Sequence, residues 1–98
     1  MSTTNNIPLP TGAVQVFPWQ PLDGYRFFAG TSRVISREAH APEVRVGIDG
    51  EQHTDGRVTR HVTCGPLDTD DSLTPLRTRQ IAAALLATAD EIDRWAVR

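Results

Sequence analysis

The feature that most constrains the fold is the segment from Pro75 to about Ala96, which contains no helix breaker after Pro75. Thr74 precedes it as a good N-cap, and proline suits the first helical position because its missing N–H costs nothing there. A helix of twenty-odd residues runs about 30 Å, roughly the width of a small domain. The segment therefore predicts one long C-terminal helix.

One face of this helix carries the residues expected to pack. At 100° per residue they form a single stripe with small or aromatic flanks: Ile81, Leu85, Thr88 and Ile92, flanked by Ala84, Ala89, Trp95 and Ala96. Such a stripe is typical of a helix that covers a sheet. We therefore expect the helix to lie across one face of the strands that precede it.

A second apolar strip lies outside that stripe. Leu86 falls near Ala82, Ala83 and Val97, and these residues form a candidate surface for a protein partner or a dimer. The alternative is alanine-rich helix propensity combined with one exposed leucine, which is normal on protein surfaces. The sequence leaves both interpretations open.

The body before the helix reads as strands. Residues 13–17 suit a strand that ends at Pro18, and residues 25–29 form an aromatic-rich strand that continues over residues 31–36. Gly30 is a position for a bend or bulge between these two parts. Residues 37–42 are expected to be a loop.

The clearest strands form a hairpin around Asp55-Gly56. Val44, Val46 and Ile48 alternate with polar residues, and an alternating strand returns over residues 58–64. A two-residue loop would set Ile48 opposite a threonine, whereas a three-residue loop over residues 54–56 sets it opposite Val62. The hairpin is therefore predicted to pair His53 with Arg57, with Gly56 left-handed in a bulge after a type I turn.

These elements predict an α+β fold: a three- or four-stranded antiparallel meander with one long C-terminal helix packed on one face. Residues 1–12 are polar, contain two prolines and have no periodicity, so we expect a flexible N-terminal tail. Residues 13–98 then form a single domain.

The composition of the chain indicates which partners and which cellular location to expect. The chain has ten basic residues, all arginine, and a net charge of −2, which argues against broad affinity for nucleic acid or anionic lipid. The absence of lysine indicates a GC-rich genome. The start lacks the features of a signal peptide, and no run reaches the roughly 20 apolar residues of a membrane span. We expect a cytoplasmic protein without a membrane partner.

The C-terminal half of the chain resembles a group of known sequences. The segment from Leu73-Thr74-Pro75 to Ala89-Asp90-Glu91-Ile92-Asp93, with the preceding hairpin, is similar to endings of small uncharacterised proteins of mycobacteria, related actinobacteria and their phages. The resemblance implies a strand-then-helix fold and a phage or prophage setting, with the host cytoplasm as the location of a phage protein. It transfers no active site and no functional residues.

The sequence contains few candidate catalytic or metal-binding residues. The predicted register sets Asp49 opposite His61, and such a pair can act as a general base, although cross-strand opposite charges are ordinary in sheets. Cys64 lies on the opposite face from His61, so neither a nucleophile nor a metal ligand matches the pair. The aspartates near residue 70 lack the glycine and glutamate of a calcium loop. We expect no enzyme activity, no cofactor and no metal.

Two binding interpretations remain. In the first, the chain is a small regulatory protein that acts through protein contacts, using the Leu86 strip, Trp19 in its proline-rich loop, or an exposed sheet edge. In the second, a nucleic acid binds one arginine-bearing sheet face beside the aromatic residues 25–28, through Arg33, Arg45, Arg57 and Arg60. We favour the protein partner or a homodimer, because twelve acidic residues dilute a basic surface.

Overall fold

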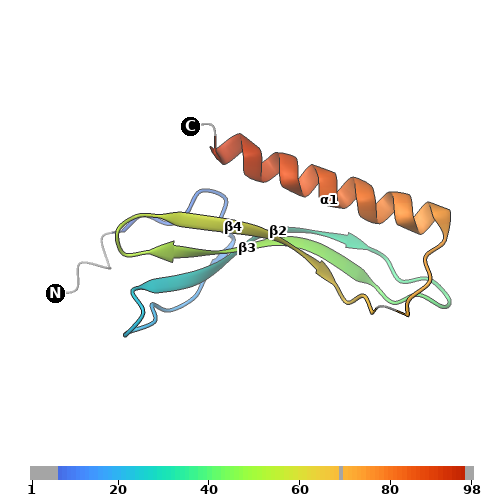
Figure 1. Cartoon of the computed structure of the whole chain (residues 1–98), viewed down its shortest axis with the longest axis horizontal. Coiled ribbons are helices and arrows are strands. Elements are labelled where there is room, and N and C mark those ends of the chain that lie inside the picture. The colour runs from blue at the N-terminus through green and yellow to red at the C-terminus, as the bar shows by residue number, and fades with distance from the viewer. Residues whose placement is uncertain (1–6, 69, 97–98) are drawn as a thin grey trace. The chain divides into compact units, whose positions relative to one another are not determined.

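The structure, a computed structural model, describes residues 7–68 and 70–96. It contains four strands and one helix, in the chain order β1 (Gln15–Val16), β2 (Tyr25–Ile35), β3 (Val44–His53), β4 (Val58–Gly65) and α1 (Pro75–Ala96) (Figure 1). The strands form one sheet in the order β1-β2-β3-β4. The predicted α+β fold, with a meander followed by a C-terminal helix, is confirmed.

Contacts divide the chain into two compact units. Unit 1 comprises Met1–Thr31 and Ile48–His61, and unit 2 comprises Ser32–Gly47 and Val62–Arg98. Strands β2, β3 and β4 therefore each contribute residues to both units.

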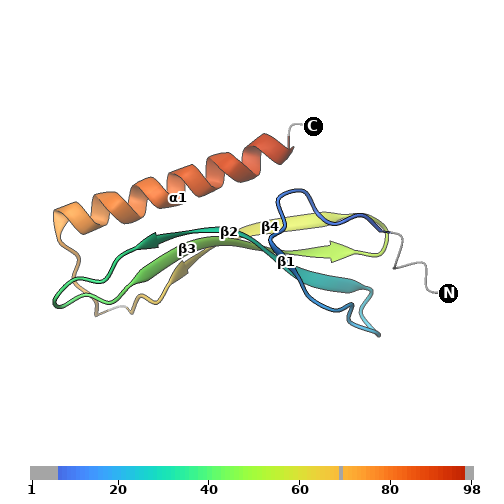
Figure 2. The ribbon, with the colours of Figure 1, turned by 180° about the vertical axis from the view of Figure 1, so that it is seen from behind.

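In unit 1, β1 is a short edge strand. It pairs antiparallel with β2 through Gln15 opposite Ala29 and Val16 opposite Phe28, and the view from behind labels the two strands side by side (Figure 2). Backbone hydrogen bonds from Val14 and Phe17 extend this pairing by one residue on each side. The predicted strand over residues 13–17 is thus present in shorter form.

The β3–β4 turn has the predicted register. The His53 N–H donates to the Arg57 carbonyl at 2.8 Å, and the Gly56 N–H donates to the His53 carbonyl at 3.0 Å. Gly56 has a φ of 94°, a left-handed conformation that glycine adopts without a Cβ penalty. The three-residue loop with a glycine bulge is confirmed.

The interior of unit 1 depends on a glycine. Phe28 on β2 is 1% exposed, and a Cβ on Gly50 of β3 would lie 2.7 Å from its ring and would also meet the Thr59 carbonyl. The guanidinium of Arg60 on β4 lies 5.8 Å from the Phe28 ring centroid, within the range of a cation–π contact. The missing side chain of Gly50 therefore leaves room for the Phe28 ring against the sheet.

Part of the predicted tail is bound to unit 1. The Gln52 amide, 4% exposed, donates to the Pro8 carbonyl at 2.6 Å, and Arg60 donates to the Thr11 carbonyl at 3.0 Å. Pro10 is buried. Residues 1–6 lie outside the described residues, but residues 8–12 are not a free tail, because the buried Gln52 of β3 and the half-buried Arg60 of β4 use their carbonyl oxygens as acceptors.

In unit 2, α1 covers the sheet with aliphatic side chains. Ile35 on β2, Val44 and Val46 on β3 and Ile81 on α1 form a buried cluster, against which Ala84 and Leu85 pack. Thr88 is fully buried, and Ile92 is half-buried. These residues confirm the predicted packing stripe of the helix.

The start of α1 also follows the prediction. The Thr74 hydroxyl accepts the Arg77 N–H at 3.1 Å, and the Thr74 carbonyl accepts the Thr78 N–H at 2.9 Å. Thr74 is thus the N-cap and Pro75 the first helical residue, where no N–H is needed.

Every second residue of β3 from Val44 to Gln52 is buried, with Gly47 buried in addition, whereas burial along β2 changes phase. In β2 the buried residues Phe28 and Ile35 are separated by an odd number of positions, which would put them on opposite faces of a regular strand. Gly30 faces Ile48, and the Arg33 guanidinium reaches α1. The alternation therefore shifts between Gly30 and Arg33, beside the glycine where a bend or bulge was predicted.

Candidate functional site

The predicted outer strip of α1 faces solvent. Leu86 is 67% exposed, and Ala82 and Ala83 are also exposed. Val97, the fourth residue of this strip, lies outside the described residues. The strip is accessible, and its side chains are small apart from Leu86.

Trp19 is engaged within unit 1. The Arg26 guanidinium lies 4.5 Å from the centroid of its ring, and the Arg26 Nε donates to the Gln52 amide oxygen at 2.8 Å. Trp19 is half-buried in this stack. Its indole face is therefore partly used inside the unit, which reduces what it could offer to a partner.

The four arginines of the nucleic-acid interpretation have partners within their own units. Three of them meet carboxylates, in the pairs Arg33–Glu91 at 3.0 Å, Arg45–Glu43 at 3.5 Å and Arg57–Asp55 at 2.7 Å. The fourth, Arg60, bonds the Thr11 carbonyl, and its burial lowers the pKa of its guanidinium. The carboxylates of the three pairs add negative charge beside Arg33, Arg45 and Arg57, which weakens the four arginines as a basic surface.

The remaining chemical candidates are not assembled. Asp49 and His61 are both exposed, and within the described part of the chain no hydrogen bond or ion pair joins them. No group of three or more His, Cys, Asp or Glu side chains among the described residues is placed to hold a metal ion. Within residues 7–68 and 70–96, no helix is long and apolar enough to cross a membrane.

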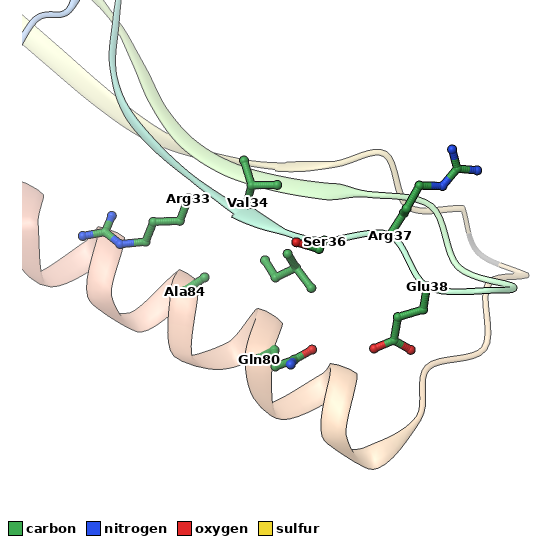
Figure 3. Close-up of a pocket in the computed structure, with 8 residues that line it drawn as sticks. Arg33, Val34, Ser36, Arg37, Glu38, Gln80 and Ala84 are labelled. Carbon is green, nitrogen blue, oxygen red and sulfur yellow. The ribbon is translucent and has the colours of Figure 1, made fainter.

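The sequence did not single out a groove in unit 2 between β2 and α1. It has a volume of about 400 Å³ and is lined by residues 33–38 and by Gln80 and Ala84 of α1 (Figure 3). The two helix residues are one turn apart, so their side chains lie on one face and both extend toward β2. The groove therefore has a strand as one wall and a helix as the other.

The strand wall of this groove is an unpaired sheet edge. β1 pairs only with Phe28 and Ala29 of β2, so within the described residues no strand continues alongside Ser32–Ile35. Alternate residues of such an edge direct their N–H and C=O groups away from the sheet. An extended chain placed in the groove would meet these groups.

Pairing in the β2–β3 hairpin identifies the outward-directed residues. Glu38 and Ala41 exchange both backbone hydrogen bonds, at 2.8 and 3.2 Å, and Ile35 and Val44 are buried in the same cluster. When this antiparallel pairing is continued along the strands, every second residue turns its backbone groups outward. Arg33 and Ile35 are these residues, and in the described chain no backbone hydrogen bond from another segment reaches their outer side.

The floor and one end of the groove are rigid. Ile35 is 8% exposed and Ala84 packs on the same cluster, so the floor is apolar. At one end Arg33 donates to Thr88 at 2.9 Å and to Glu91 at 3.0 Å, and both acceptors are buried. Buried charged groups held in this way fix the distance between strand and helix.

A second cavity of about 320 Å³ lies in unit 2 between residues 40–42 and 44 on one side and residues 66–67 and 70–73 on the other. Its wall includes Arg77, which is 2% exposed and donates to the carbonyl oxygens of Ser36 and Pro42. Arg77 thus ties the β2–β3 loop to the first turn of α1. Its position four residues before Ile81, on the packing stripe, was an available indication of burial.

We compared the chain with protein families, curated proteins and solved structures. No protein-family model, no curated protein and no solved structure matches the chain.

Proposed function

We propose that this chain is a small non-enzymatic binding protein, with regulatory function, that accepts an extended segment of a partner protein along the free edge of β2. The observation that carries the proposal is the unpaired edge at Arg33 and Ile35 beside a groove walled by α1. Strand addition of this kind is a common mode of peptide recognition: main-chain hydrogen bonds supply affinity, and alternate side chains supply specificity.

The groove supports this mode better than the other surfaces do. An added strand would pair with backbone donors and acceptors that no described segment reaches, and every second side chain would rest on the floor of Ile35 and Ala84. The Arg33–Glu91 and Arg33–Thr88 contacts keep the helix wall in place before binding, which lowers the ordering cost.

The test is selection of peptides from a displayed random library, followed by amide hydrogen exchange of the bound protein. We expect the Arg33 and Ile35 amides to become protected. We also expect Gln80→Trp, which fills the groove from the exposed side of α1, to abolish binding. Ala82→Trp, on the opposite side of the same helix, should leave binding intact.

Two results would overturn the proposal. One is a library that yields no binder. The other is a set of binders that leave Arg33 and Ile35 unprotected and respond to Ala82→Trp but not to Gln80→Trp.

The exposed strip at Leu86 is the second protein-binding surface. Its 67% exposure makes it available to a partner or a second copy. If it is the binding surface, Leu86→Asp abolishes association while circular dichroism remains that of the folded protein. Association that is unchanged by Leu86→Asp would remove this strip from consideration.

The nucleic-acid alternative has one specific observation in its favour. Phe17 and Phe27 are 40% and 43% exposed, the Phe17 N–H donates to the Phe27 carbonyl, and Phe27 meets Tyr25 edge-on at 5.2 Å. Exposed aromatic rings can stack with bases of single strands. Binding of a single-stranded oligonucleotide that falls steeply with added salt and is lost in Phe27→Ala would support this alternative.

The sequence resemblance suggests a setting for the proposed function. We propose that the protein acts in the cytoplasm of an actinobacterial cell, as a phage-derived or host-derived regulator.

A further inference from the structure

We infer that the segment bound along β2 alternates apolar and acidic side chains, with the apolar ones turned toward α1 and the acidic ones turned away from it. This inference rests on the proposed function and adds the chemistry of the partner. In an added strand, successive side chains point to opposite faces of the sheet, so the two sides of the groove select independently.

The side toward α1 favours apolar residues. Ile35 and Ala84 form its floor, and the small Ala84 side chain leaves volume for a side chain of the partner. Glu38 extends toward this side in Figure 3, and it is exposed. A carboxylate of the partner would lose hydration on this floor and would meet Glu38, so both effects disfavour it.

The side away from α1 favours acidic residues. Val34, 46% exposed, and Arg37 both extend to this side in Figure 3. Arg37 is exposed and has no ion pair with any described residue. An acidic side chain turned to this side of β2 would therefore face a guanidinium that has no carboxylate partner among the described residues.

A second arginine reinforces this preference. The guanidinium of Arg45, an exposed residue of β3, donates to the Ser32 hydroxyl of β2 at 3.1 Å, so Arg45 reaches across to the exposed side of β2. The contact of Arg45 with Glu43 is long, at 3.5 Å, with side chains 57% and 52% exposed. Such an exposed pair is weak, so Arg45 can also turn to an incoming carboxylate.

The experiment uses three capped seven-residue peptides and the full chain. All three peptides have valine at alternate positions, and the other positions carry Glu, Gln or Lys. We expect the Glu peptide to bind roughly 3- to 10-fold more tightly than the Gln peptide at low salt, because one or two exposed ion pairs are gained. The Lys peptide should bind most weakly, and the differences should largely disappear near 1 M salt.

Variants of the protein assign this preference to a residue. Arg37→Gln should reduce the ratio of Glu-peptide to Gln-peptide affinity toward one. Arg79→Gln, at an exposed helix position outside the groove, removes the same charge and should leave the ratio as in the wild type. A Glu peptide with N-methyl groups on the amides that face β2 should not bind, whereas methylation of the alternate amides should be tolerated.

The outcomes separate the inference from the proposed function. If none of the peptides protects the Arg33 and Ile35 amides, strand addition at this edge is overturned. If all three peptides protect these amides with equal affinity, the edge binds but the acidic preference is wrong. If the Glu preference survives Arg37→Gln, the assignment of that preference to the outer side of β2 is wrong.

Discussion

Unit 1 and unit 2 bury the same three strands in different ways. In unit 2 a regular helix covers the sheet with aliphatic side chains, and Val44, Val46 and Ile81 are at most 5% exposed. In unit 1 the aliphatic Ile48 is buried together with an aromatic ring, Phe28, and an amide, Gln52. An irregular segment before β1 supplies carbonyl acceptors for Gln52 and for the half-buried Arg60.

The difference shows two physical routes to a buried sheet face. A helix brings its own satisfied backbone, so it needs only an apolar stripe to cover a sheet. An irregular segment carries backbone carbonyls that must be bonded, so it is matched by polar side chains that point from the strands. The Gln52–Pro8 bond illustrates this matching in unit 1, and the bonds from the buried Arg77 to two loop carbonyls illustrate it beside the helix of unit 2.

The largest expected effects are losses of stability when a buried side chain is truncated in either unit, and they allow a direct comparison of the two interiors. Phe28→Ala should lower the free energy of unfolding by about 3–5 kcal/mol, and Ile81→Ala by about 2–5 kcal/mol, because each leaves a cavity in its unit. Since β2, β3 and β4 contribute to both units, we expect one cooperative transition in urea for both variants. Two separate transitions for either variant would show that the units unfold independently.

Gly50→Ala tests the close packing of unit 1. The new Cβ would lie 2.1 Å from the Thr59 carbonyl oxygen and 2.7 Å from the Phe28 ring, so we expect a loss of about 1–3 kcal/mol in chemical denaturation. Gly65→Ala is the matched control, because its Cβ would meet no atom nearer than 3.9 Å. Equal effects of the two substitutions would contradict the role given to Gly50.

Thr74→Ala tests the start of the helix that covers unit 2. Loss of the bond from the Arg77 N–H to the Thr74 hydroxyl should cost about 1 kcal/mol of stability. Thr74→Ser retains the acceptor and should cost much less. A Thr74→Ala protein as stable as the Thr74→Ser protein would show that packing alone positions α1.

The smallest effect concerns Asp55 at the turn of unit 1. Hydrogen bonds from the Arg57 backbone N–H and then from its side chain hold the pKa of Asp55 below its ordinary value of 3.8. The stabilisation is therefore present above pH 3.8 and is lost as the pH falls through the lowered pKa of the folded state.

Asp55→Asn should therefore lower the Tm slightly at neutral pH. The difference from the wild type should shrink as the pH falls below 3.8. A difference that persists unchanged into strong acid would show that the carboxylate charge plays no part in the turn.

Much of the fold was readable from short stretches of the chain. The Gly56 bulge and the Thr74 cap each depend on bonds between residues two to four positions apart, and the helix stripe depends on one repeating period. Such local preferences operate in any chain that carries these residues, so pattern and turn chemistry predict them.

The candidate site was not predictable in the same way. The groove exists because β1 is short and leaves the end of β2 unpaired, and because Arg33 bonds Glu91, fifty-eight positions further along the chain. Arg33 was assigned to a possible nucleic-acid surface, since its sequence neighbours give no indication of this partner. Trp19 was likewise assigned to a possible partner surface, yet Arg26 occupies one face of it.

The sequence by itself determined the elements, their order, the hairpin register and the side of α1 that is buried, because these follow from interactions over a few residues. Only the tertiary structure decided which polar groups are buried, such as Arg77, Glu91 and Gln52, and which sheet edge stays open. A polar side chain is buried only where a distant part of the chain supplies its hydrogen-bond partner, and a sheet edge stays open only where no distant strand pairs with it. Local sequence patterns do not predict either of these contacts.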